Sequence, residues 1–106
     1  MRLTSQQVRG IEQALEEFVR NIPASLYLFG SRTKDHLKGG DIDLLLVTQE
    51  ESISKLLKSR KHEIIASIHS QIGEQKVDLK IASEDEINVD PFLKAVFPQA
   101  VLICRW

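Results

Sequence analysis

Apolar residues recur every three or four positions near the start of the chain. Between Thr4 and Pro23 they are Val8, Ile11, Leu15, Phe18, Val19 and Ile22. This spacing places them on one face of an α-helix. Thr4 or Ser5 can cap the first turn, and Pro23 closes the pattern. We therefore predict an amphipathic helix from the capping residue to Ile22.

Two short apolar runs follow this helix. The first, "SLYLFG", reads as a buried strand that ends at Gly30, and the second, "IDLLLVT", spans Ile42 to Thr48. Past Asp43 the second run is apolar on both faces, which is typical of a strand covered on both sides. We expect it to be central in its sheet.

The second half of the chain alternates in the same way between helical and extended patterns. Apolar residues at helical spacing from Glu50 to about Gln71 predict one long amphipathic helix, with Gly73 as its stop. In "KVDLKIA", residues 76–82, apolar and polar residues alternate strictly, which predicts a half-exposed strand. Asp90 and Pro91 predict the start of a short helix that ends before Pro98, and "AVLIC" reads as a last strand.

These elements together predict an α/β or α+β fold, with helices packed against one small mixed sheet. The 106 residues fit a single domain spanning residues 1–106, because two domains of half this size would each have too small a core. The sequence shows no internal repeat and no linker.

Composition narrows the class of protein. The chain is 42% hydrophobic and 27% charged, has no apolar run of the roughly 18 residues that a membrane span needs, and lacks a secretory pattern at "MRLTSQQVRG". Cys104 is the single cysteine, so no internal disulfide forms. We expect a cytoplasmic protein. Its net charge of −1 provides no overall attraction to nucleic acid, so any contact with a polyanion must be local.

Two carboxylates stand at the entrance of the central strand. Asp41 and Asp43 are two residues apart, so in an extended chain they share a face with Cα atoms roughly 6.6 Å apart. Like charges this close raise each other's pKa unless a cation neutralises them. Mg²⁺ commonly binds one or two carboxylates together with substrate phosphates. The spacing therefore favours a divalent metal.

Other residues could complete a phosphate and metal site. Asp78 is the candidate third carboxylate, although it could equally be the solvated middle of a Lys-Asp-Lys face. Gly30 permits a tight turn after the first strand, and Ser31 with the following N–H groups could bind phosphate oxygens. Arg32 and Lys34 add positive charge. Taken alone, the glycine-serine pair also suits an ordinary turn.

The joint pattern resembles a known superfamily. Gly30-Ser31, followed by Asp41-Ile42-Asp43 and by Asp78 on a later strand, resembles the nucleotidyltransferases with a DNA polymerase β-like fold. The form "FGSR…GGDIDLLLV" and the short chain are similar to the minimal nucleotidyltransferases (MNT). This resemblance covers Leu28 to Ile81. Lys76 and Lys80 flank Asp78 at positions where apolar residues are common in the family.

The resemblance implies a nucleotidyltransferase fold and specific roles. Gly30 and Ser31 would grip the triphosphate, with Arg32 and Lys34 stabilising it. Asp41, Asp43 and Asp78 would be the catalytic and metal-binding residues, holding two Mg²⁺ ions, and Asp78 would also assist the attacking hydroxyl. ATP would be the substrate.

The resemblance also implies a partner. MNT proteins are typically encoded beside a helical HEPN toxin, a ribonuclease, and act as its antitoxin by attaching AMP to it. Two alternatives stay open: a binding antitoxin or regulatory subunit with an idle site, and a nucleotidyltransferase subunit acting on a small molecule or, less in keeping with the charge, on a nucleic acid. The apolar C-terminal stretch from Pro91 to Trp106 packs on the core or contacts a partner, so a homodimer is a further expectation.

Overall fold

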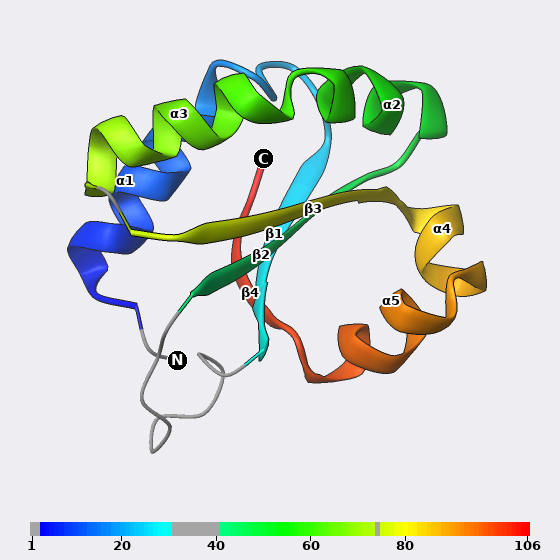
Figure 1. The fold of residues 1–106 in the computed structure, drawn as a ribbon. Helices are drawn as coiled ribbons and strands as arrows, with labels where there is room; N and C mark the ends of the chain where they lie inside the picture. The colour runs from blue at the N-terminus through cyan, green and yellow to red at the C-terminus, as the bar shows by residue number, and fades with distance from the viewer. Residues whose placement is uncertain (1–2, 31–40, 74) are drawn as a thin grey trace.

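Four strands form a mixed sheet in the order β3-β2-β1-β4 (Figure 1). The computed structural model describes residues 3–30, 41–73 and 75–106. Strand β2 pairs antiparallel with β1 and parallel with β3, and β1 pairs antiparallel with β4. The strands are β1 (Ala24–Phe29), β2 (Ile42–Thr48), β3 (Val77–Ser83) and β4 (Val101–Arg105). The predicted mixed α/β fold and the interior position of β2 are confirmed.

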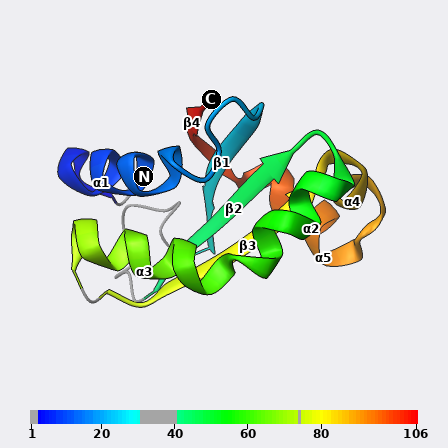
Figure 2. The same cartoon turned by 90° about the horizontal axis from the view of Figure 1, so that it is seen from above.

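Three helices cover one face of the sheet, here called the closed face, which carries Leu26, Leu44 and Leu79. They are α1 (Ser5–Glu16), α2 (Glu51–Ser59) and α3 (Lys61–Ile72). Helix α3 packs mainly against α1, and α2 packs against β3 (Figure 2). Gly10 is buried in α1, where an added Cβ would lie 2.8 Å from Cγ2 of Ile72. The absence of a side chain at Gly10 therefore lets α1 and α3 approach closely.

The opposite face, here called the open face, carries Tyr27, Asp43 and Asp78. Helices α4 (Glu84–Val89) and α5 (Pro91–Val96) and the short 3₁₀ helix η2 (Phe97–Gln99) lie against it. Residues of these helices and of the strands form a second, smaller apolar cluster on this face. Its buried members are Phe29, Leu45, Val47, Ala82, Ile87 and Leu93. In Figure 1 these helices gather at the end of the sheet where β2 and β3 finish. The beginnings of β2 and β3 lie at the other end.

The first predicted helix is shorter than expected. Thr4 caps α1 as predicted, through a capping box with Gln7, but the helix ends at Glu16 instead of Ile22. The N–H groups of Phe18 and Val19 both donate to the carbonyl oxygen of Leu15, which closes a turn. Asn21 then takes a left-handed φ of 62° that leads the chain into β1. The buried apolar residues after Glu16 therefore reach the core from turns.

The long helix predicted from Glu50 is in fact two helices. The helical backbone is interrupted at Arg60, whose φ of −107° and ψ of 16° are not helical. Leu57 before the break and Ile64 after it are both buried in the same cluster, so the hydrophobic pattern continues across the break. The break allows α2 to lie over β3 while α3 lies against α1. Gly73 ends α3 with a φ of 90°, as predicted.

The C-terminal third follows the sequence pattern, with one addition. Asp90 caps α5, with Pro91 in its first turn, and the last strand forms as predicted. Trp106 packs against the core cluster of the closed face. Helix α4 was not predicted, and its signal is the capping box in which Ser83 and Glu86 bond each other's backbone N–H groups. No helix in the described part of the chain is long and apolar enough to cross a membrane.

Candidate functional site

Asp43 and Asp78 lie side by side at the beginnings of β2 and β3. They are direct partners in the parallel pairing, on neighbouring strands about 4.8 Å apart. Their neighbours Ile42, Leu44, Val77 and Leu79 are buried on the closed face. Because side chains alternate along a strand, both carboxylates are directed to the open face. Core packing thus places two of the three predicted aspartates together.

Asp41 lies immediately before β2, and not within it as its predicted alternation assumed. The entry to the strand is fixed by the N–H of Ile42, which donates to the carbonyl oxygen of Lys76 over 3.0 Å. The Asp41 carboxylate pairs with the ammonium of Lys76, with Oδ2 and Nζ 3.5 Å apart. The Lys76 side chain is 78% exposed and the Asp41 side chain is 44% exposed, so water screens this ion pair and it contributes little to stability.

The surroundings of Asp43 disfavour the charged form of its carboxyl group. Burial raises the pKa of its carboxyl above the ordinary value, and the negative charges of Asp78 and Asp41 raise it further. The positive charge of Lys80 acts in the opposite direction. Asp41 and Asp78 are therefore each close enough to repel Asp43, and a cation bound beside Asp43 would relieve that repulsion.

Gly30 lies directly against Asp43. It ends β1 with a φ of 78°, and its neighbour Phe29 is the register partner of Asp43 in the antiparallel pairing. A Cβ at position 30 would overlap Oδ2 of Asp43. Glycine is needed here both for its backbone conformation and for the space that the carboxylate occupies.

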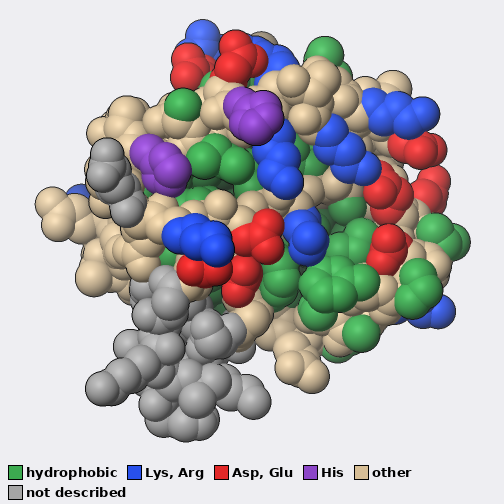
Figure 3. Space-filling view, viewed as in Figure 1, with side chains coloured by type: hydrophobic (Ala, Val, Ile, Leu, Met, Phe, Trp, Pro, Cys, Tyr) green, Lys and Arg blue, Asp and Glu red, His purple; other side chains and the backbone are tan. Residues whose placement is uncertain are grey.

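Two further residues border the carboxylates. The ammonium of Lys80 lies 5.3 Å from the centre of the Phe92 ring, and Phe92 also contacts Phe29 edge to face with ring centres 6.3 Å apart. Figure 3 shows basic and acidic side chains gathered in the middle of one surface, beside a patch of hydrophobic ones. Sequence reasoning missed Phe92, because its position beside β3 depends on how α5 packs.

The carboxylates have the chemistry of a metal site, but their arrangement is incomplete. Their oxygen atoms are the ligands that Mg²⁺ prefers, and the repulsion at Asp43 favours a bound cation. In the arrangement shown, however, no three acidic, histidine or cysteine side chains of the described residues are grouped so that they could hold one ion. Asp41 pairs with Lys76 instead. The donor set therefore suits the metal, and Asp41 would have to exchange its lysine partner for it.

The remaining predicted site residues, Ser31, Arg32 and Lys34, lie outside the described residues. Their predicted phosphate contacts stay predictions.

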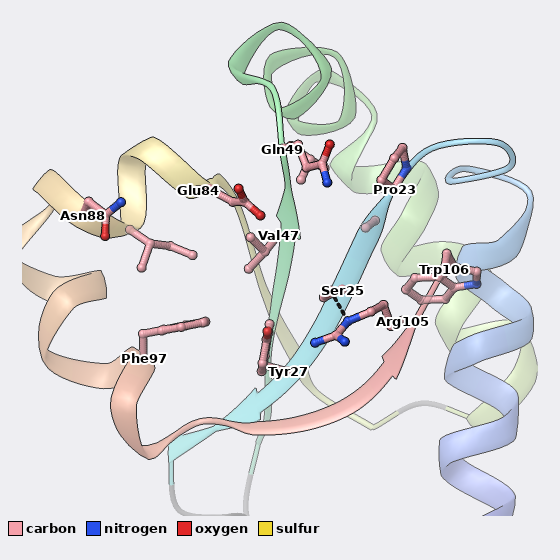
Figure 4. A pocket seen from close by; sticks show the side chains of 13 residues that line it. Pro23, Ser25, Tyr27, Val47, Gln49, Glu84, Asn88, Phe97, Arg105 and Trp106 are labelled. Carbon is pink, nitrogen blue, oxygen red and sulfur yellow. Dashed lines mark hydrogen bonds between the residues drawn. The ribbon is translucent and has the colours of Figure 1, made fainter.

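A groove of about 510 Å³ opens at the other end of the open face (Figure 4). Tyr27, Val47, Glu84, Phe97 and Arg105 are among the residues that line it, and Arg105 Nε donates to Ser25 Oγ over 3.3 Å. Val47 lies four residues after Asp43 on the same strand, which corresponds to roughly 13 Å. The groove and the aspartates are therefore separate regions of one face.

Comparisons with known proteins agree with this geometry. Residues 8–101 match the family model of a nucleotidyltransferase domain. The chain has no significant match among curated protein sequences. One similar solved structure is a spectinomycin adenyltransferase from Enterococcus faecialis with ATP and spectinomycin, at 24% identity and a TM-score of 0.55. The match covers 80% of this chain and 36% of that one, so this chain spans little more than a third of its length.

A second similar structure is a provisionally assigned nucleotidyltransferase from Sulfolobus solfataricus. It has 24% identity and a TM-score of 0.53, and the match covers 92% of this chain and 81% of that one. At this level of identity the two structures support the fold, while the family model supports membership.

Proposed function

Because the chain belongs to the nucleotidyltransferase domain family, we propose that it transfers AMP from ATP to a hydroxyl group of a partner protein. The observation that carries this proposal is the pairing of Asp43 with Asp78 beside Gly30, at one end of the open face. ATP is proposed as the donor because a structurally similar enzyme is an adenyltransferase that was crystallised with ATP.

The reaction follows from where the proposed groups lie. The acceptor hydroxyl gives its proton to the Asp78 carboxylate, and its oxygen attacks the α-phosphorus of ATP. The bond from that phosphorus to the oxygen bridging to the β-phosphorus breaks, and pyrophosphate leaves. Asp78 suits the role of base because it is half-buried next to Asp43 and directed to the open face.

Mg²⁺ is proposed as the cofactor, in two ions, with Asp41, Asp43 and Asp78 as its protein ligands. When bound, it would neutralise charge on the phosphates during the displacement. Gly30 keeps the end of β1 close to Asp43 without covering its carboxylate, which leaves room for phosphate oxygens at that point. Ser31, Arg32 and Lys34 are proposed to contact the triphosphate.

The proposed acceptor is a HEPN-type toxin, which the chain would inactivate as its antitoxin. The sequence motifs, which resemble those of the minimal nucleotidyltransferases, support this choice. The chain spans 36% of the length of the similar adenyltransferase, so its acceptor is a proposal that rests on the motifs. A cytoplasmic location is part of the same proposal.

The test is transfer of label from ATP labelled at the α-phosphate to the product of the adjacent gene, which this proposal expects to be a helical protein. We expect Asp43→Asn and Asp78→Asn each to reduce labelling by about 100-fold or more, because each removes a charge from the reacting centre. Asp85→Asn is the matched control, since it makes the same chemical change at an exposed position on α4. Equal labelling by all variants would refute the proposed site.

A catalytically idle antitoxin is the second candidate function, and the Asp41–Lys76 ion pair favours it. In the structure shown, one proposed metal ligand is already paired with a lysine. An idle site predicts that the toxin is neutralised equally by the wild type and by Asp43→Asn, with no label transferred by either.

A further inference from the structure

Lys80 places a positive charge beside the carboxylates. It follows Asp78 by two residues in β3, so both side chains lie on the open face. None of the ion pairs found between described residues involves Lys80. Its charge is nevertheless close enough to counteract the raised pKa of Asp43. A positive charge is thus present at the site and is available to a ligand.

Phe92 fixes where that charge lies. The ammonium of Lys80 is 5.3 Å from the ring centre, a distance at which the electron-rich face of an aromatic ring attracts a cation. The ring is itself positioned by its edge-to-face contact with Phe29, the register partner of Asp43. Phe92 remains 49% exposed although it is a large apolar residue. The ring therefore connects Lys80 to the strand that ends at Gly30.

The lysine immediately before β3, Lys76, differs from Lys80 in its partner and its exposure. Lys76 precedes Asp78 by two residues, its side chain is 78% exposed, and its ammonium pairs with Asp41. Lys80 is half-buried, and its ammonium lies over the ring of Phe92 on α5. The two lysines flank the same aspartate, yet only Lys80 is positioned by a neighbour that carries no charge. An anion can therefore approach Lys80 without displacing a carboxylate.

We propose that Lys80 binds the β- and γ-phosphate oxygens of the nucleoside triphosphate, and that Phe92 positions its ammonium for this contact. This inference rests on the proposed function, because it names the part of the substrate that one residue recognises. Lys80 is then a specificity residue that favours a triphosphate over a monophosphate. Phe92 is a positioning residue, since it acts through Lys80.

The experiment measures binding of three nucleotides by titration calorimetry with Mg²⁺ present. The probes are α,β-methylene-ATP, α,β-methylene-ADP and AMP, of which the first cannot release pyrophosphate. For Lys80→Met, which keeps an unbranched apolar stem without the charge, we expect the Kd for the triphosphate to rise about 10- to 100-fold. The Kd for AMP should change by less than about threefold, and that for the diphosphate should rise by an intermediate factor.

Two control variants keep the result interpretable. Lys94→Met removes the same charge from an exposed position on α5 and should leave all three Kd values unchanged. Lys80→Arg retains a cation and should restore triphosphate binding to within about fivefold of the wild type. Phe92→Leu should weaken triphosphate binding by about three- to tenfold and leave AMP binding unchanged.

The outcomes separate this inference from the proposed function. If the wild type binds none of the nucleotides, both are overturned. If it binds them and Lys80→Met weakens all three equally, or none, only the role of Lys80 is overturned. If Phe92→Leu weakens AMP as much as the triphosphate, the ring contacts the nucleoside and its positioning role is wrong.

Discussion

The two faces of the sheet differ in how completely they are covered. On the closed face, α1, α2 and α3 bury Leu26, Leu44 and Leu79 in one continuous cluster. On the open face, the apolar cluster under α4 and α5 gives way to Asp43 and Asp78 at the beginnings of β2 and β3. The same strands therefore contribute a complete core to one side and an incomplete core with carboxylates to the other.

The covered face allows the carboxylate site on the other face to be held rigidly by few residues. A carboxylate near the end of a strand is held by the apolar neighbours on either side of it, which are anchored in the opposite face. Burying charged groups is costly unless they are paired, so Asp43 and Asp78 can be accommodated only where the covering helices leave the face accessible. If the closed face provides stability and the open face provides activity, substitutions on the two faces should have different effects.

Leu44 and Leu45 are adjacent, fully buried residues that face opposite sides of the sheet. Replacing either by Ala leaves a cavity and should reduce the free energy of unfolding by about 2–5 kcal/mol, measured by urea denaturation. Only Leu45→Ala should also lower label transfer under conditions where both variants are folded, because Leu45 shares its face with Asp43. Equal activity of the two folded variants would contradict the division of roles.

Gly30 and Gly73 both have positive φ, but they differ in their surroundings. Replacing either by Ala should cost about 1–2 kcal/mol of stability, because the left-handed conformation is unfavourable for a residue with a Cβ. At Gly73 nothing lies within 4 Å of the new Cβ, whereas at Gly30 it overlaps Asp43. We expect Gly30→Ala to lose label transfer and Gly73→Ala to retain it. Thermal melting with parallel activity assays provides the measurement.

Ser54 tests the polar interior of the closed side. Its hydroxyl is fully buried and lies 2.5 Å from that of Thr48, which also donates to the carbonyl oxygen of Glu50. Ser54→Ala removes this hydrogen bond between α2 and the end of β2, and should cost about 1 kcal/mol in urea denaturation. Label transfer should stay unchanged, since the contact lies at the far end of β2 from Asp43. A loss of transfer in the folded variant would show coupling along the strand.

Asp43→Asn should slightly stabilise the metal-free protein at neutral pH. Burial and neighbouring charges raise the pKa of Asp43 in the folded state, so the folded protein binds its proton more tightly than the unfolded chain does. Wild-type stability therefore falls as the pH rises from the ordinary aspartate pKa through the raised one. The variant lacks this loss, so its advantage in Tm should be absent well below pH 3.8 and reach its full value at neutral pH.

Added Mg²⁺ should reverse this order. It should raise the Tm of the wild type and leave that of Asp43→Asn nearly unchanged, because only the wild type retains the carboxylate. Equal shifts in both proteins would argue against metal binding at Asp43.

Much of the fold could be predicted because hydrophobic periodicity reports directly on burial. The run from Leu44 to Val47 identified the interior strand, and the alternation from Val77 to Ile81 identified the face on which Asp78 lies. The ends of the helices were harder to predict from the sequence. Phe18 and Val19 fit a helical face yet reach the core from a turn, since burial alone does not require helical backbone.

The site was predictable only as far as it follows from strand alternation. The pairing of Asp43 with Asp78 needed just two neighbouring strands, and the parallel register provides them. The ion pair of Asp41 with Lys76 and the contact of Phe92 with Lys80 depend on side-chain conformations and on the packing of α5. The hydrophobic periodicity of the sequence does not predict such contacts, because tertiary packing determines which of these side chains meet.

The parallel register of β2 and β3 also bears on how the protein can change over generations. Because Val77, Leu79 and Ile81 must face the core, inserting or deleting one residue within β3 would move the side chains after that point to the opposite face of the sheet. Substitutions on the open face leave this constraint untouched. Side chains on the open face can therefore change by point mutation, while the number of residues in β3 is constrained by the core.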